Sequence, residues 1–231
     1  MRRIYREVRV APAGGGWGIL LDSRALQTPA RAPLVLPRRV LAEAVAAEWE
    51  AQVERIVPAT MPLMRMAATA IDRVVPQRSQ AAAEIVGYAS TDLVCYRADR
   101  PAELVQRQAM LWQPLLDWAT LRFDAPLLVV TGIAPKPQPP AAVAAIQSAV
   151  GALDPFWLAA LHGATTACGS VVIGLALVEQ RLDAEGAWQA SQLDETFQIE
   201  QWGEDPEAAA RRRELRRDID AASRFMHLLR S

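Results

Sequence analysis

Apolar residues rich in aromatic and β-branched types gather in two short stretches near the start of the chain, YREVRV at residues 5–10 and WGILLD at residues 17–22. Short runs of this kind beside a turn signal are typical of β-strands. Glycines at positions 14–16 separate the stretches and can adopt the positive φ angles of a tight turn, so the pattern predicts a β-hairpin. A phosphate-binding loop is the alternative for these glycines, but neither a GxGxxG nor a Walker pattern is present and no helix follows.

From Arg38 onward the apolar residues recur every three or four positions, which is the spacing of a helix with one buried face. A first helix is marked by Leu41, Val45, Trp49, Gln52 and Ile56 and should end at Pro58. Further helices are predicted over residues 61–75, 79–91, 102–121, 139–150, 155–168, 170–179, 183–202 and 206–229, and a short strand over residues 127–131.

Strands come first in this order and helices follow them, without regular alternation, which is typical of the α+β class. We therefore expect a small N-terminal strand-plus-helix unit, residues 1–76, followed by a larger and mainly α-helical domain, residues 77–231. The three clustered methionines of the second helix, Met61, Met64 and Met66, could form an adaptable surface, but filling of core gaps is the commoner use.

Composition indicates a folded chain without a general attraction to nucleic acid or lipid. Hydrophobic residues make up 52% of the sequence, charged residues 22%, and the formal net charge is -1. Cys95, Cys168 and the two histidines stand apart from one another, so no metal or other cofactor is expected. The N-terminus lacks the apolar region of a signal peptide, and the most apolar stretch, residues 169–178, is about half the roughly 20 residues of a membrane span. We expect a cytoplasmic protein.

Catalytic motifs are also missing: the sequence has no GxSxG elbow, no HExxH and no P-loop, so an enzyme is not expected. The small residues around Ser170 should instead let two helices approach closely. One alternative is a hydrolase or lyase that uses the carboxylates of Asp92, Glu195 and Glu204. Another is a nucleic-acid-binding module that uses Arg211–Arg217, although a solvated helix face explains this arginine run better.

The predicted helix over residues 183–202 carries an acid among large apolar side chains. Trp188, Glu195, Ile199 and Trp202 follow one another by seven, four and three residues, so they should share one face. A carboxylate in that position needs a partner, either within the fold, such as Arg97 or a tryptophan indole, or on another chain. Directly afterwards Gly203 can end the helix, and Asp205 and Pro206 can begin the next one.

Six blocks of sequence, spread over nearly the whole chain, belong together: LDSRALQTP at residues 21–29, LAEAVAAEWEAQ at 41–52, MPLMRMAATAIDRV at 61–74, YASTDLVCYRA at 88–98, RQAMLWQPLLDW at 107–118 and LDETFQIEQWGED at 193–205. In this order they resemble the assembly chaperones of F1-ATPase that attend the alpha subunit, called F1 assembly factor two in mitochondria. The resemblance implies an ATP-independent chaperone without cofactor or turnover, which binds the unassembled alpha subunit and prevents its aggregation. It also implies that Glu195, Trp202, Gly203 and Glu204 contact this partner.

Overall fold

The structure is a computed structural model that describes residues 2–132 and 136–231. Over this part of the chain it divides into two compact units. Unit 1 comprises Met1–Arg78, Asp154–Ala160 and Arg224–Ser231, and unit 2 comprises Ser79–Leu153 and Leu161–Ser223. A single boundary at Pro76 was expected, whereas two later segments of the chain belong to unit 1.

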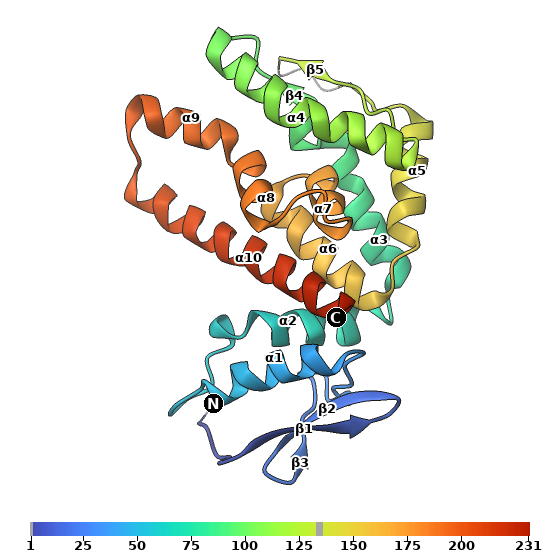
Figure 1. Ribbon diagram of the computed structural model, residues 1–231, viewed down its shortest axis with the longest axis vertical. Helices are drawn as coiled ribbons and strands as arrows, with labels where there is room; N and C mark the ends of the chain where they lie inside the picture. The colour runs from blue at the N-terminus through green and yellow to red at the C-terminus, as the bar shows by residue number, and fades with distance from the viewer. Residues whose placement is uncertain (1, 133–135) are drawn as a thin grey trace. The chain divides into compact units, whose positions relative to one another are not determined.

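The strands of unit 1 form an antiparallel sheet near the N-terminus, and helices follow, which confirms the α+β class (Figure 1). The sheet has the order β1 (Val8–Ala13), β2 (Gly16–Leu21) and β3 (Arg24–Ala25). The predicted hairpin is confirmed, with φ of 54° at Gly14 and 84° at Gly15. The first strand begins later than predicted because the amides of Arg6 and Glu7 donate to the carboxylate of Asp22, at 3.0 and 2.9 Å.

Helix α1 (Arg39–Glu50) ends earlier than its apolar pattern predicts. The reason is the side chain of Gln52, which is buried just beyond the helix. Its oxygen accepts the N–H of Val57 at 2.8 Å, and its nitrogen donates to Glu48 O and to Thr60 Oγ1. These bonds offer the backbone an alternative to another helical turn.

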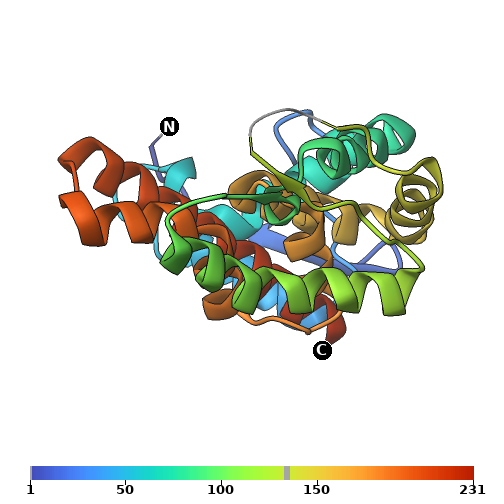
Figure 2. The ribbon, with the colours of Figure 1, turned by 90° about the horizontal axis from the view of Figure 1, so that it is seen from above.

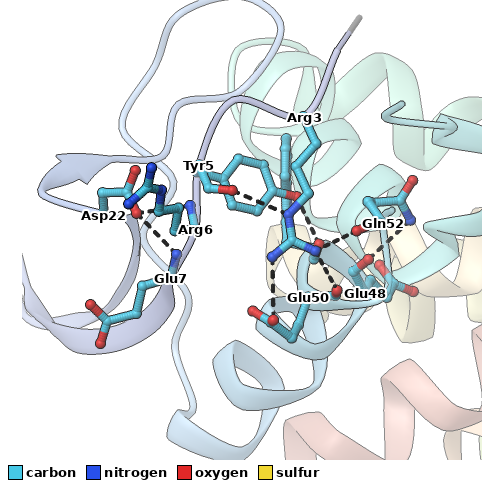
Figure 3. A network of polar contacts seen from close by, with 9 residues as sticks. Arg3, Tyr5, Arg6, Glu7, Asp22, Glu48, Glu50 and Gln52 are labelled. Atoms are coloured by element: carbon cyan, nitrogen blue, oxygen red, sulfur yellow. Dashed lines mark hydrogen bonds and ion pairs between the residues drawn. The ribbon is translucent and has the colours of Figure 1, made fainter. Parts of the chain in front are cut away.

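The first residues of the chain are fastened to the end of α1 (Figure 3). The guanidinium of Arg3 donates to the carbonyl oxygens of Glu50, at 2.9 Å, and of Gln52, and it pairs with the Glu50 carboxylate at 3.2 Å. The hydroxyl of Tyr5 donates to Trp49 O at 2.7 Å. A cation is stabilised at this position because the last carbonyls of a helix carry partial negative charge.

Helix α2 (Pro62–Thr69) follows and continues into a π-helical turn, Ala70–Val74. At the start of α2, the backbone amides of Leu63 and Met64 donate to the two oxygens of the Glu48 carboxylate, each at 2.8 Å. Met61 and Met64 are buried, so the interpretation of the methionines as core residues is confirmed for these two.

Most of the remaining elements follow the predicted order. The helices are α3 (Arg78–Gly87), α4 (Ala102–Phe123), α5 (Pro140–Gly151), α6 (Pro155–Cys168), α7 (Val171–Val178), α8 (Ala184–Ser191), α9 (Leu193–Trp202) and α10 (Pro206–Arg230). Short 3-10 turns cover Pro58–Thr60, Tyr88–Thr91 and Leu93–Cys95. The predicted strand at residues 127–131 is reduced to β5 (Val130–Thr131), which pairs in parallel with β4 (Tyr96–Arg97). No helix within the described residues is long and apolar enough to cross a membrane.

Helix α7 forms the centre of unit 2, since the residues from Val171 to Leu177 are all buried. The small residues near Ser170 do permit close approach, as expected. A Cβ atom at position 174 would lie 2.6 Å from Oγ1 of Thr165 and 2.8 Å from Cδ1 of Leu161, both on α6. Glycine at this position therefore allows α6 and α7 to pack closely.

Replacing Gly174 by alanine is expected to lower the free energy of unfolding by about 1–3 kcal/mol, because the added methyl group overpacks the α6–α7 contact. Urea denaturation of the purified variant measures this cost. Gly163→Ala is the matched control: it lies in α6, where a Cβ atom would meet no described atom within 4 Å. The control should gain about 0.5–1 kcal/mol from helix propensity, and equal losses in both variants would contradict the packing explanation.

Candidate functional site

The predicted helix over residues 183–202 is wrong as one continuous element, because Gln192 separates α8 from α9. Its φ of -111° and ψ of 16° lie outside the helical region, and its buried side chain accepts a hydrogen bond from Nε of Arg212 at 3.3 Å. Because of this break, Trp188 does not share one helical face with Glu195 and Trp202, as the spacing had predicted. Trp188 instead contacts arginines of α10.

Asp194 and Glu200 are the acids of α9 with an internal partner, whereas Glu195 has none among the described residues. Nε2 of Gln108 on α4 donates to the Asp194 carboxylate at 2.8 Å, and burial raises the pKa of that carboxyl. Glu195 is half-buried and has no hydrogen bond or ion pair with any residue that the structure describes. Of the partners expected for it, Arg97 donates through Nε to Val94 O and through Nη1 to Gln108 O, and its buried Nη2 has no hydrogen bond to any described residue. The Trp112 indole donates to Ala190 O, so neither side chain binds the Glu195 carboxylate.

Helices α9 and α10 form a hairpin whose connecting end projects from the rest of unit 2 (Figures 1 and 2). Trp202 ends α9 there with 79% of its surface exposed. Gly203 ends α9 as expected, with a positive φ of 84° and an extended ψ of 169°. The Asp205 carboxylate accepts the amides of Glu207 and Ala208 at 3.1 and 3.0 Å, which confirms its capping role before Pro206.

Glu204 lies in the same connection and pairs with Arg212 of α10 at 3.1 Å. The Glu204 side chain remains 38% exposed, so solvent screens the pair and its contribution to stability should be below about 1 kcal/mol. Three of the four predicted contact residues, Trp202, Gly203 and Glu204, thus lie together at the end of the hairpin. Glu195 lies roughly two helical turns away along α9.

Arginines of α10 hold Trp188 of α8 in place, an arrangement that the sequence pattern did not predict. The guanidinium carbons of Arg212 and Arg216 lie 5.3 and 5.6 Å from the centroid of the Trp188 ring. Arg212 also donates to Thr196 Oγ1 at 3.1 Å, and Arg216 pairs with Glu185 at 2.7 Å. Cation–π contacts of this kind fix both the ring and the guanidinium groups.

Grooves on the surface of unit 2 border Trp188 and the arginines that contact it. The arginine groove, about 550 Å³, is lined by Trp188, Glu204, Ala209, Arg212, Arg213, Arg216 and Arg217. The apolar groove, about 570 Å³, is lined by Arg107, Met110, Leu111, Glu185, Trp188, Gln189, Leu193, Thr196 and Arg212. Trp188 and Arg212 belong to both linings. The arginine run is therefore only partly the solvated face that was predicted.

The carboxylates proposed for a hydrolase or lyase do not meet in these grooves. Asp92 is fully buried, and its carboxylate accepts the amides of Val94 at 3.2 Å and Val172 at 3.1 Å. Burial raises the pKa of Asp92 to about 6. Neither groove is lined by Asp92 or Glu195, so these acids and Glu204 share no pocket there. Within the described residues, no group of three or more histidine, cysteine or acidic side chains could hold a metal ion.

Comparison with known proteins identifies the family. A family model described as the ATP12 chaperone protein matches residues 2–120. The crystal structure of Atp12 from Paracoccus denitrificans is 44% identical over 98% of this chain and 97% of its own, with a TM-score of 0.93. A mutant of that protein with one aspartate replaced by lysine gives the same values. The Agrobacterium tumefaciens protein Atu1473 is 42% identical over 99% of this chain and 86% of its own, with a TM-score of 0.94.

The family model covers just over half of the chain, and the solved structures cover nearly all of it. The resemblance drawn from the sequence blocks is thereby confirmed, and with it the assignment to a chaperone family in place of an enzyme family. The chain belongs to the ATP12 chaperone family, whose members are assembly chaperones.

Proposed function

We propose that this protein binds the unassembled alpha subunit of the F1 sector of ATP synthase and keeps it from aggregating until the alpha/beta ring forms. Membership of the ATP12 chaperone family is the observation that carries the proposal. Binding needs no nucleotide: a chaperone of this kind holds its client by surface complementarity alone.

The end of the α9–α10 hairpin is the surface that we propose for client contact. Trp202 offers a large exposed apolar side chain, and tryptophan is frequent among the residues that dominate binding energy in protein interfaces. Glu204 lies two positions away with a partly exposed carboxylate. Charged groups at the edge of an interface mainly set specificity and the rate of encounter. A client surface with an apolar pocket beside a basic group would fit this pair.

Light scattering of aggregation-prone alpha subunit tests the function. Addition of the purified chain should suppress the scattering without ATP, and gel filtration should show a complex with the alpha subunit. The isolated beta subunit is the control client, and we expect neither effect with it. Unchanged scattering together with no complex would refute the proposal.

Charge reversal at the hairpin end should separate binding from folding. Glu204→Lys is expected to weaken capture of the alpha subunit about tenfold or more, alone or with Trp202→Ala. The thermal melt should stay nearly unchanged, because Trp202 is largely exposed and solvent screens the ion pair of the partly exposed Glu204. Glu43→Lys is the control for a charge reversal elsewhere, since it breaks a more exposed ion pair with Arg39 on α1. A large drop in the melting temperature of Glu204→Lys would assign that residue to the fold instead.

A further inference from the structure

The arginine groove presents guanidinium groups of two kinds. Arg212 and Arg216 are held in place by Glu204, Glu185 and Asp220, at 3.1, 2.7 and 3.1 Å. The guanidinium of Arg213, in contrast, has no hydrogen bond or ion pair with any described residue. Arg212 and Arg216 therefore form a fixed wall of the groove, and Arg213 remains available to a ligand.

Arg217 is the second available cation. Its pair with Glu214 is long, at 3.7 Å, and the two side chains are 73% and 72% exposed. Exposed pairs of this geometry contribute little, so a better-placed carboxylate can replace Glu214 at small cost. The groove thus combines an indole wall, ordered guanidiniums and two cations without a firm partner.

We infer that the arginine groove binds an acidic segment of a protein client, with carboxylates on Arg213 and Arg217 and an apolar side chain against Trp188. Arginine suits this task because its planar fork can bind a carboxylate through two parallel hydrogen bonds. The inference deepens the proposed function, on which it rests, by adding a basic contact surface to the acidic and aromatic hairpin end.

A protein segment fits the charge distribution better than nucleic acid does. Glu204 lines the groove itself, and Glu185, Glu214 and Asp220 lie against its arginines. A phosphate backbone that continues beyond the groove would meet these carboxylates, and the net charge of -1 provides no wider basic surface to follow. A short acidic segment can place its charges on Arg213 and Arg217 alone.

Fluorescence anisotropy with a short labelled peptide tests the inference on the full-length chain. The peptide consists of glutamates around a central leucine, and a version with lysines in place of the glutamates is its control. We expect the glutamate peptide to bind, the lysine peptide not to bind, and Arg213→Glu with Arg217→Glu to weaken the affinity about tenfold or more.

Arg211→Glu is the matched control variant, because Arg211 lies on the same helix and is exposed but does not line the groove. It should bind the peptide within about twofold of wild type, an energy difference below 0.5 kcal/mol. Circular dichroism confirms that each variant is folded. The inference would be overturned if Arg211→Glu lost as much affinity for the glutamate peptide as the variant with Arg213→Glu and Arg217→Glu. Stronger binding of a single-stranded RNA at the same groove would also overturn it.

Peptide binding and capture of the alpha subunit are measured separately, so their failures can be distinguished. A folded chain that captures the alpha subunit but not the glutamate peptide would overturn the groove inference and leave the proposed function standing. A chain that binds the peptide through Arg213 but does not capture the alpha subunit would instead refute the proposed function.

Discussion

Replacement of Asp92 by alanine is expected to lower the free energy of unfolding by about 3 kcal/mol or more at neutral pH. The carboxylate is fully buried and accepts the amides of Val94 and Val172, so its removal leaves buried donors without partners. Val172 is the second residue of α7, and the loss therefore reaches the centre of unit 2.

Urea denaturation measures this loss, and Asp183→Ala is its control. Asp183 also caps a helix, since it accepts the amide of Gly186 at 2.7 Å, but it does so in an exposed position. An exposed cap is worth about 1 kcal/mol. If both variants lost the same amount, burial would not be the reason why Asp92 matters.

The same carboxyl should make stability depend on pH in an unusual direction for an acid. Burial favours the protonated form in the folded state and raises the pKa of Asp92 to about 6, from the ordinary aspartate value of 3.8. Between these values the folded state binds more protons than the unfolded state, so the free energy of unfolding falls as pH rises from 3.8 to about 6. Wild type should lose about 3 kcal/mol over this range relative to Asp92→Asn, whose side chain does not titrate. A constant difference between the two proteins would contradict this assignment.

Removal of the Trp112 side chain should have an effect of similar or greater size. Trp112 is fully buried in α4, its indole N–H donates to Ala190 O at 2.8 Å, and the guanidinium carbon of Arg97 lies 5.3 Å from the centroid of its ring. Trp112→Ala is expected to cost about 3–5 kcal/mol, because it leaves a cavity and an unpaired carbonyl.

Two further variants identify the cause of that loss when all are compared by urea denaturation. Trp112→Phe keeps most of the volume and should cost less than Trp112→Ala. Trp202→Ala removes a tryptophan that is 79% exposed and should leave the free energy of unfolding almost unchanged. A similar cost for the Trp112→Ala and Trp202→Ala variants would contradict the distinction between a core tryptophan and a contact tryptophan.

Local patterns predicted many elements of the fold well. Helix α6 begins and ends where its sequence pattern places it, because Pro155 and Gly169 bound it, and the glycine hairpin also forms where it was expected. Predictions were wrong where a side chain overrides periodicity. Gln52 ends α1 early and Gln192 divides a predicted helix, each through a buried amide that binds atoms outside the regular helical pattern.

The candidate site was harder to predict than the fold. Spacing along one helix made Glu195 the acid in need of a partner, whereas Asp194 meets Gln108, which is 86 residues away in the sequence. Sequence periodicity contains no information about such distant pairs. The grooves were missed for the same reason, since Trp188 and Arg212 come from different helices. The run of arginines was the available signal, but whether it faces solvent or a groove depends on the neighbouring helix.

Unit 1 is built from segments that lie far apart in the chain, and this affects the order in which the protein folds during synthesis. Its sheet and first helices emerge from the ribosome early, but Asp154–Ala160 and Arg224–Ser231 also belong to it, and Arg38 donates to Leu229 O at 3.1 Å across 191 positions. Contacts so distant in sequence form slowly because they close a long loop. The nascent N-terminal segment must therefore remain incomplete until translation reaches the last helix, and during that interval the chaperone itself exposes apolar surface to the cell.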